Sequence, residues 1–261
     1  MKRLSFLWLA GVLAAAFPAA QSRAQDSMQD PVRIVKAMSD YLAGAKTMSL
    51  TFDADIEVIT PDIQKLQFAS SGRVVLSRPN KVRATRTGGY ADVELVFDGN
   101  TLTVLGKKDV ETLAQVQAPG SIDQLVHRLR DEFSIAVPGA DFLLSNSYDE
   151  LMTDVLDVKY IGRGVIDGVE CHHLAFRNQD TDWQLWVETG NKPIPRKYVI
   201  TSKSVAAAPQ YTLRIKELRT DAELGADAFV FKMPASAKQV DINALSDLDE
   251  VPQGVVPGGK K

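Results

Sequence analysis

The spacing of apolar and polar residues changes several times along the chain, and each change marks a different kind of element. From Pro31 to Ala45 apolar side chains recur at helical spacing, after Asp30 as a capping residue and with the proline at the first helical position. From Met48 to Val58 apolar residues at even positions alternate with polar residues at odd positions. This alternation predicts a long strand with one buried face and one solvated face.

Turn residues divide the next stretch into further strands with the same alternation. The turns are Pro61-Asp62, Arg78-Pro-Asn80 and Asp98-Gly-Asn100. Together with the apolar positions between them, they predict a meander of six antiparallel strands that ends near Val116. Gly72 falls inside the second strand, where a glycine indicates a bend or a bulge.

Helical spacing returns in the middle of the chain. Ser121 can cap a helix whose apolar residues, from Ile122 to Phe133, share one face. Pro138-Gly139 ends this region, and we expect two shorter helices at residues 140–144 and 148–155.

Short apolar strands then resume near Val158. Asp167-Gly168 is a hairpin turn, since glycine tolerates the positive φ that such turns need. The pattern continues to Ile215 and ends with a short strand near Val240. We therefore predict an α+β, mostly β fold: one large curved antiparallel sheet of about ten or eleven strands, an unclosed half-barrel covered by helices.

The N-terminus has the features of a secretory signal. Basic residues precede the apolar run from Leu4 to Ala20, and Ser22-Arg-Ala24 places small residues at a cleavage site. A membrane anchor is the alternative, but the run is near the lower limit of ~17–25 residues for a spanning helix. We expect a signal peptide over residues 1–24, cleavage after Ala24, a periplasmic location and no remaining transmembrane anchor. One domain over residues 25–245 and a disordered tail over 246–261 would follow.

The net charge of the mature chain limits the kinds of molecule that it is expected to bind. The signal removes three basic residues, so the mature chain would carry 27 basic and 33 acidic residues, a formal net charge of −6. Such a balance argues against nucleic acid and against electrostatic attachment to anionic lipid. A basic cluster could still meet an acidic partner or lipid headgroups, although an ordinary solvated face is the favoured interpretation. Its members are Arg73, Arg78, Lys81, Arg83 and Arg86.

Residues with possible chemistry form no catalytic or metal-binding pattern. His172 and His173 are neighbours on a strand and point to opposite faces, so they do not readily bind one ion. Cys171 is the only cysteine, and we expect a buried, unreactive thiol. Asp53, Asp55 and Glu57 alternate along one strand, which favours a solvated strand face over a catalytic carboxylate pair. No serine lies in the Gly-x-Ser-x-Gly motif of a nucleophile elbow. We predict no enzyme activity, cofactor or metal.

The order of several motifs resembles a known family. An opening amphipathic helix, a long alternating strand, Arg78-Pro-Asn-Lys-Val-Arg83, Phe97-Asp-Gly99 and Phe229-x-Phe231-x-x-Pro234 resemble the lipoprotein-localisation factors (LolA/LolB-like). His173-Leu-Ala-Phe176, Asp182-Trp-Gln-Leu-Trp186 and Pro195-Arg-Lys-Tyr-Val-Ile-Thr201 resemble a related family of predicted periplasmic proteins of unknown function. The resemblance covers nearly the whole mature chain. It implies an unclosed barrel that is capped by helices around a hydrophobic cavity, with no known reaction.

Two function classes remain open. The first is a soluble periplasmic protein that binds a lipid or a lipoprotein acyl chain, for carriage, sensing or chaperoning. The second is an envelope protein–protein interaction module, in which the cavity is simply core. Apolar type and alternation select the candidate ligand-binding residues, which are Phe52, Ile56, Phe68, Leu95, Phe97, Phe142 and Leu185.

Overall fold

The computed structural model describes residues 30–107, 110–243, 251–252 and 255, so the expected signal peptide lies outside the described residues and the expected tail lies mostly outside them. Within the described residues, twelve strands form one sheet. The strands are β1 (Thr47–Ile59), β2 (Lys65–Ser77), β3 (Lys81–Gly88), β4 (Asp92–Phe97), β5 (Thr101–Lys107), β6 (Glu111–Gln117), β7 (Asp157–Ile166), β8 (Val169–Arg177), β9 (Thr181–Glu188), β10 (Pro195–Ser202), β11 (Gln210–Thr220) and β12 (Lys238–Gln239). The helices are α2 (Pro31–Ala43), α3 (Ile122–Asp131), the 3₁₀ helix η1 (Ala140–Leu143) and α4 (Ser147–Met152).

The sheet joins two antiparallel meanders. Its order is β12-β6-β5-β4-β3-β2-β1-β11-β10-β9-β8-β7, so β1 and β11 pair across the junction between the two halves. The predicted meander of six strands is confirmed as β1 to β6. The antiparallel strands number eleven, and β12 adds two residues in parallel with β6. At the other end lies β7, whose pairing with β8 shifts register between Tyr160 and Gly162.

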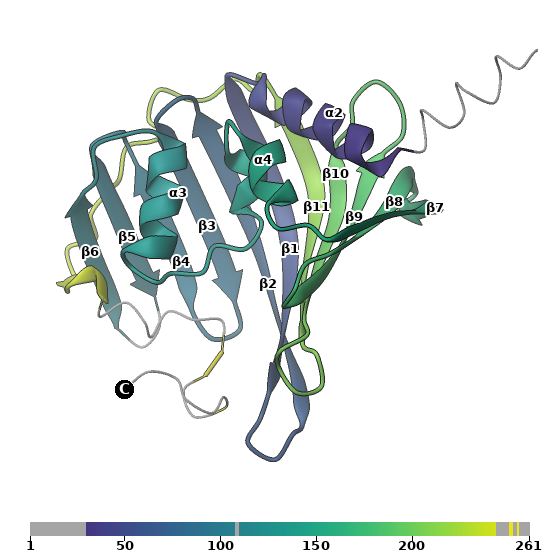
Figure 1. Cartoon of the computed structure of the whole chain (residues 1–261). Helices are drawn as coiled ribbons and strands as arrows, with labels where there is room; N and C mark the ends of the chain where they lie inside the picture. Colours follow the sequence, from purple (N-terminus) through teal and green to yellow (C-terminus); the bar gives the residue numbers. More distant parts are fainter. Residues whose placement is uncertain (1–29, 108–109, 244–250, 253–254, 256–261) are drawn as a thin grey trace, which may run out of the picture.

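The sheet is strongly curved and its helices lie on the concave side (Figure 1). We call the helix-covered side the inner face and the opposite side the outer face. One continuous core joins apolar side chains of the helices to those of the inner face, from β6 across to β8. The predicted half-barrel covered by helices is therefore confirmed. In the described part of the chain, no helix combines the length and the apolar character needed to cross a bilayer.

Local sequence accounts for where the helices begin. Asp30 Oδ1 accepts hydrogen bonds from the backbone N–H groups of Val32 (3.0 Å) and Arg33 (3.4 Å), which have no partner inside α2. At α3, Ser121 and Gln124 form a reciprocal capping box. This helix ends at Asp131, two residues before the predicted end of its apolar face.

The hairpin between β7 and β8 has the predicted turn. Asp167 (φ 49°) and Gly168 (φ 82°) both adopt positive φ, as a two-residue turn of this hand requires, and Ile166 pairs with Val169 on either side of it.

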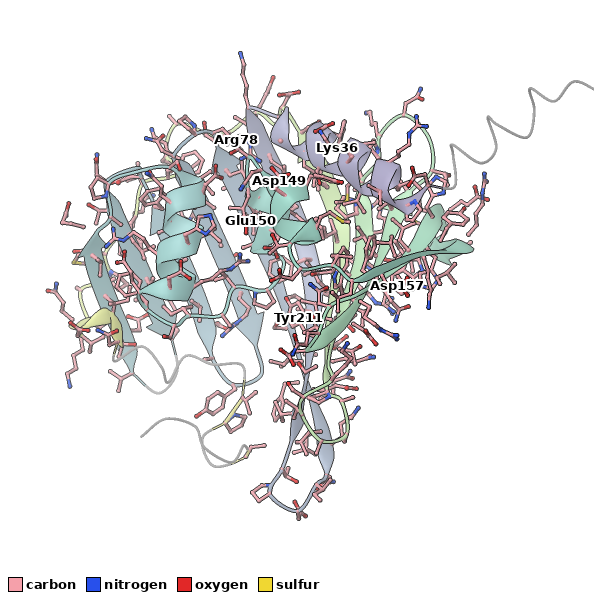
Figure 2. The ribbon with its side chains drawn as sticks, viewed as in Figure 1. Lys36, Arg78, Asp149, Glu150, Asp157 and Tyr211 are labelled. Atoms are coloured by element: carbon pink, nitrogen blue, oxygen red, sulfur yellow. The ribbon has the colours of Figure 1, made fainter. Side chains whose placement is uncertain are left out.

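The guanidinium of Arg78 attaches the helices to the sheet. Its Nη1 donates to the carbonyl oxygen of Leu143, at the end of η1, over 2.7 Å, and its Nη2 donates to that of Leu42, in the last turn of α2, over 3.4 Å. Figure 2 labels this residue at the top of the sheet, near the end of α2. A cation is favourable at carbonyl groups that end a helix. The expectation that Arg78 is an ordinary solvated residue is therefore wrong.

A second member of the basic cluster also departs from that expectation. Arg86 lies opposite Gly72 on the same side of β3 as Val82, whose side chain belongs to the core. It therefore belongs to the inner face. Arg73 is exposed, as predicted, with its guanidinium 3.4 Å from the hydroxyl oxygen of Ser49.

Replacing Arg78 tests its anchoring role. Arg78→Met keeps the apolar stem and removes both charge-assisted hydrogen bonds, so we expect the free energy of unfolding to fall by about 2–3 kcal/mol. Arg73→Met is the matched control on the outer face and should change stability by less than about 0.5 kcal/mol. Urea denaturation of both variants measures the difference, and equal losses would contradict the role of Arg78.

Candidate functional site

The seven predicted ligand-binding residues lie on the inner face of the sheet or, for Phe142, on η1, and they differ in how deeply they are buried. Phe97, Leu185 and Phe142 are fully buried in the core. Phe142, on η1, packs edge-on against Tyr198 with 5.3 Å between ring centroids. Burial in this contact also raises the pKa of Tyr198. These three residues stabilise the packed part of the molecule.

The other four predicted residues are half-buried. Phe52, Ile56, Phe68 and Leu95 lie on β1, β2 and β4, farther from the helices than the packed core. Phe52 and Leu95 pack against the edge of the core, whereas Ile56 and Phe68 are not part of it. The inner face therefore continues beyond the core as an apolar surface that the helices leave partly open.

Strand register arranges this open surface as a row of apolar side chains. Phe68 lies opposite Ile56, which lies opposite Tyr211, and Ile200 continues the row on β10. The row ends at the fully packed Trp183, which stacks on Phe176 with 3.7 Å between ring centroids. An extended apolar molecule could lie along such a row and bury its surface against four strands.

Gly72 gives Phe52 the room that it occupies. A Cβ on Gly72 would come within 2.3 Å of the Phe52 ring and 2.4 Å of the Thr85 carbonyl oxygen. The Phe52 ring therefore lies over the backbone of β2. The strand has no bulge at Gly72, since β1 and β2 pair in continuous register through this residue. The register shift on β1 lies on its other side, against β11, between Thr51 and Phe52.

Residues 132–139, which we call the crossing segment, run from α3 to η1 on the inner side of the sheet (Figure 1). Phe133, Ile135 and Val137 are half-buried and pack against the core, while the residues between them are exposed. The segment comes close to β11 at its end, because a Cβ on Gly139 would lie 2.7 Å from Leu213 Cδ2. The alternation of residues 133–137 was the signal for this segment, and the helical interpretation of the region missed it.

The crossing segment is fixed mainly at its ends. The backbone N–H groups of Phe133 and Ile135 donate to Arg128 and Leu129 of α3, and that of Ala140 donates to Val137. In the part of the chain that the structure describes, no backbone hydrogen bond joins it to a strand of the sheet. Its apolar side chains therefore hold it over the inner face.

His173 lies on the outer face, together with the strand carboxylates that we predicted to be solvated. His173 stacks on Trp186 with 4.1 Å between ring centroids, and Lys197 Nζ lies 5.0 Å from the same indole ring. Trp183 and Trp186 therefore face opposite sides, as predicted. Asp53 accepts a hydrogen bond from Ser71 and Glu57 pairs with Lys65 at 3.0 Å. These contacts are typical of a solvated, structurally paired surface.

His172 lies on the opposite side of β8 from His173. Its Nδ1 is 3.2 Å from the Tyr160 hydroxyl, and burial together with the charge of Arg163 lowers its pKa. Among residues 30–107 and 110–243, no three of the histidine, cysteine, aspartate and glutamate side chains gather in a way that could hold a metal ion.

Two hollows on the surface of the described residues contain none of the seven residues. One, of about 480 Å³, lies at the projecting tip of the β1–β2 hairpin and is lined mostly by apolar side chains, including Ile63 and Val205. The other, of about 500 Å³, lies on the outer face of β3 to β6. Sequence reasoning singled out neither hollow as a site.

Comparison with known proteins identifies one family and several distant structures. The family model described as "Predicted periplasmic protein (DUF2092)" matches residues 32–243. No curated protein matches the chain. The lipoprotein LppX of Mycobacterium tuberculosis is 13% identical, with 76% of this chain and 98% of that chain covered and a TM-score of 0.46.

Two further solved structures are similar at the same distant level. The MucA/MucB complex of Pseudomonas aeruginosa matches at 13% identity and a TM-score of 0.43, with 80% of this chain and 62% of that chain covered. A LolA superfamily protein of Nitrosomonas europaea matches at 12% identity and a TM-score of 0.33, with 76% and 96% covered. None of these likenesses bears on function.

The thiol of Cys171 gives a pH-dependent test of burial. Desolvation, with the nearby charge of Glu188, raises the pKa of Cys171 from its ordinary value of 9.0 to about 11. Between these values the unfolded chain loses the thiol proton while the folded protein keeps it, so the free energy of unfolding should fall as pH rises. We expect this fall to be smaller in Cys171→Ala.

Denaturation of both proteins across that pH range measures the difference. Below pH 9.0 a thiol reagent should label the native protein far more slowly than the unfolded chain. Rapid labelling of the native protein, or identical pH profiles for the two proteins, would contradict a buried thiol.

Proposed function

The chain belongs to the family of predicted periplasmic proteins designated DUF2092, and on that premise we propose that it binds a lipophilic ligand on its inner face. The ligand is an acyl chain, either of a free lipid or of a lipoprotein. The role is carriage, sensing or chaperoning in the periplasm, without covalent chemistry. The proposal includes removal of the signal peptide after Ala24.

The half-buried apolar row is the observation that supports this proposal best. Its members Phe68, Ile56, Tyr211 and Ile200 are half-buried and leave apolar area in contact with water, although they lie on the face that elsewhere forms the core. Burying such area contributes roughly 25 cal/mol per Å². An acyl chain has the length and the apolar character to cover a row that spans four strands.

The crossing segment would act as a displaceable cover. Phe133, Ile135 and Val137 fill part of the inner face with apolar side chains that an acyl chain could replace. Replacing the crossing segment by an acyl chain would break few hydrogen bonds. In the described residues, the backbone of the segment is hydrogen-bonded near its ends and not to the strands of the sheet. Ligand binding and segment displacement would then be coupled, since each favours the other.

A polar substitution in the row separates ligand binding from core packing. Ile56→Asn removes apolar contact at a half-buried position, so we expect affinity for a fluorescent fatty-acyl probe to fall by about tenfold or more. The protein should stay folded. Leu185→Asn, in the packed core, should instead cost about 2–5 kcal/mol of stability. Asp55→Asn, next to Ile56 on the outer face, is the matched control and should change neither property.

Probe titration and thermal melting are measured together on all three variants and on the wild type. Loss of folding in Ile56→Asn would mean that the row is ordinary core. Failure of the wild type to bind any acyl probe, with native and delipidated protein melting alike, would end the lipid proposal.

Weakening the cover should have the opposite effect on affinity. Ile135→Ser reduces the apolar contacts that hold the crossing segment on the inner face, so the binding-competent form becomes more populated. We expect the acyl probe to bind several-fold more tightly. Ala136→Ser changes an exposed neighbour on the same segment and should leave affinity unchanged. Weaker binding by Ile135→Ser would show that the segment is part of the site and not its cover.

A second candidate function is protein binding at the projecting hairpin tip. Ile63 is 68% exposed and Val205 is 45% exposed, and both line the apolar hollow there. Ile63 also has φ 65°, an uncommon conformation for a β-branched residue, and such strain gathers at functional positions. Loss of partner capture in Ile63→Ser, with acyl-probe binding unchanged, would favour this interaction module over lipid binding.

A further inference from the structure

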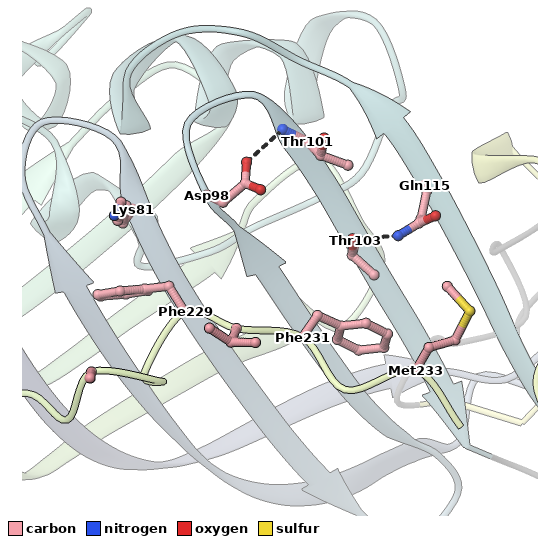
Figure 3. A pocket seen from close by; sticks show the side chains of 10 residues that line it. Lys81, Asp98, Thr101, Thr103, Gln115, Phe229, Phe231 and Met233 are labelled. Carbon is pink, nitrogen blue, oxygen red and sulfur yellow. Dashed lines mark hydrogen bonds between the residues drawn. The ribbon is translucent and has the colours of Figure 1, made fainter. Parts of the chain in front are cut away.

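The hollow of about 500 Å³ lies on the outer face of β3 to β6, opposite the face of the proposed acyl-chain site. Its lining differs from that site because it includes polar and charged side chains as well as apolar ones. Residues 226–233 cross the outer face of β3 to β6 and form one wall of it (Figure 3). Arg83 Nη1 donates to the Ala228 carbonyl oxygen at 3.3 Å, and Val240 N donates to the carbonyl oxygen of Leu113 at 2.8 Å. The chain is thus hydrogen-bonded to the sheet within this segment, at Ala228, and again after it, at Val240.

The floor of the hollow is polar. It is lined by Thr101 and Thr103 on β5 and by Gln115 on β6. The amide of Gln115 is exposed, Thr103 is 4% exposed, and the hydroxyl oxygen of Thr101 accepts a hydrogen bond from Gln117 Nε2 over 3.3 Å. Gln115 Nε2 donates to the Thr103 hydroxyl over 3.2 Å, which fixes the amide beside that side chain. Each of these groups carries both donor and acceptor capacity.

The wall is apolar and partly aromatic. Phe229, Phe231 and Met233 lie over the polar floor, and Figure 3 shows them along one side of it. Phe231 is half-buried and Met233 is 59% exposed, so part of the apolar wall is accessible. A molecule in the hollow would therefore meet apolar groups on one side and hydrogen-bonding groups on the other.

A pair of opposite charges completes the lining. Asp98 Oδ1 accepts the backbone N–H groups of Asn100 (2.9 Å) and Thr101 (2.8 Å), which lower the pKa of this carboxyl together with the charge of Lys81. Lys81 lines the same hollow and brings an ammonium group to it. One carboxylate and one ammonium leave the hollow without a net charge.

We propose that this hollow binds a neutral, polyhydroxylated ligand, such as a sugar unit of a glycan. Sugar hydroxyls donate and accept at once, which matches the Thr101, Thr103 and Gln115 groups. The C–H faces of a sugar ring match the apolar wall of Phe229 and Phe231. The volume of about 500 Å³ falls within the range of small-molecule sites and accommodates one or two sugar rings.

The proposal is independent of the acyl-chain site. Thr103 and Gln115 occupy odd positions on β5 and β6, whereas the core residues Val104 and Ala114 point to the inner face. Failure of one site to bind its ligand therefore leaves the other untouched.

Nuclear magnetic resonance titration of the full protein tests the proposal directly. The probe is chitobiose, the disaccharide of N-acetylglucosamine, with maltose as a second neutral sugar and diglycine as a zwitterion of similar reach. We expect saturable shifts of the Thr101, Thr103 and Gln115 signals by a sugar, with Kd on the order of 1 mM, as an open site of this size allows. Diglycine should shift none of them.

Variants then assign the contacts. Gln115→Ala removes an exposed amide and Phe231→Ala removes the ring, and each should weaken sugar binding by about fivefold or more. Gln67→Ala, an exposed glutamine on β2 outside the hollow, is the matched control and should bind as the wild type does. Unchanged spectra elsewhere confirm that each variant is folded.

Four results would overturn the proposal, three from the titration and one from the variants. Those from the titration are an absence of saturable shifts with both sugars, shifts that lie outside the hollow, and binding of diglycine in place of the sugars. Sugar binding that is equally strong in Gln115→Ala, Phe231→Ala and the wild type would overturn it as well.

Discussion

The pairing of β1 with β11 is the constraint on which the rest of the molecule depends. β1 is paired along both edges, with β2 on one side and β11 on the other. Without the second pairing, the two meanders would be separate sheets, each with an uncovered apolar face. With it, one inner face runs through the whole sheet, and the helices inserted between the meanders lie on that concave side. Arg78 then fixes that helical layer to the β2–β3 turn.

One consequence is a mismatch between the sheet and its cover. Helices of 13, 10 and 6 residues, with one 3₁₀ turn, face a sheet of twelve strands. They bury Phe97 and Leu185 completely, while Ile56 and Phe68 stay half-exposed toward the far end of β1 and β2. An apolar face without enough protein to cover it can gain free energy by covering itself with something else. This is the physical basis for proposing a lipophilic ligand there.

Alternation in the sequence was sufficient to predict the strands and their faces. It placed Phe52 and Ile56 on one side of β1 and the carboxylates of Asp53 and Asp55 on the other, and the Asp167-Gly168 turn followed from glycine chemistry. Alternation does not report depth, because burial depends on which helix arrives above a strand. Hence Leu185 and Ile56 were indistinguishable as ligand-binding candidates, although one is core and the other is half-exposed.

The residues that sequence reasoning misjudged depend on contacts between distant segments. Arg78 read as a solvated turn residue because its partners, the carbonyl groups of Leu42 and Leu143, meet only in the folded protein. The crossing segment has the alternation of a strand but pairs with none in the described chain, and its apolar side chains pack against the core. Phe229 and Phe231 were recognised only as a motif, and their position over a polar floor follows from the path of the chain after β11.

The edge strand β7 affects the tendency of the protein to aggregate. β7 ends the sheet, and an open edge that carries the exposed side chains of Ile161 and Val165 is a template onto which another chain can add a strand. Its register shift at Tyr160 and Gly162 bends that edge, and Lys159 and Arg163 place charges along it. These features discourage intermolecular strand addition. A closed barrel has no free edge and so avoids this kind of aggregation. In this unclosed barrel, the irregular pairing of β7 gives protection at the edge instead.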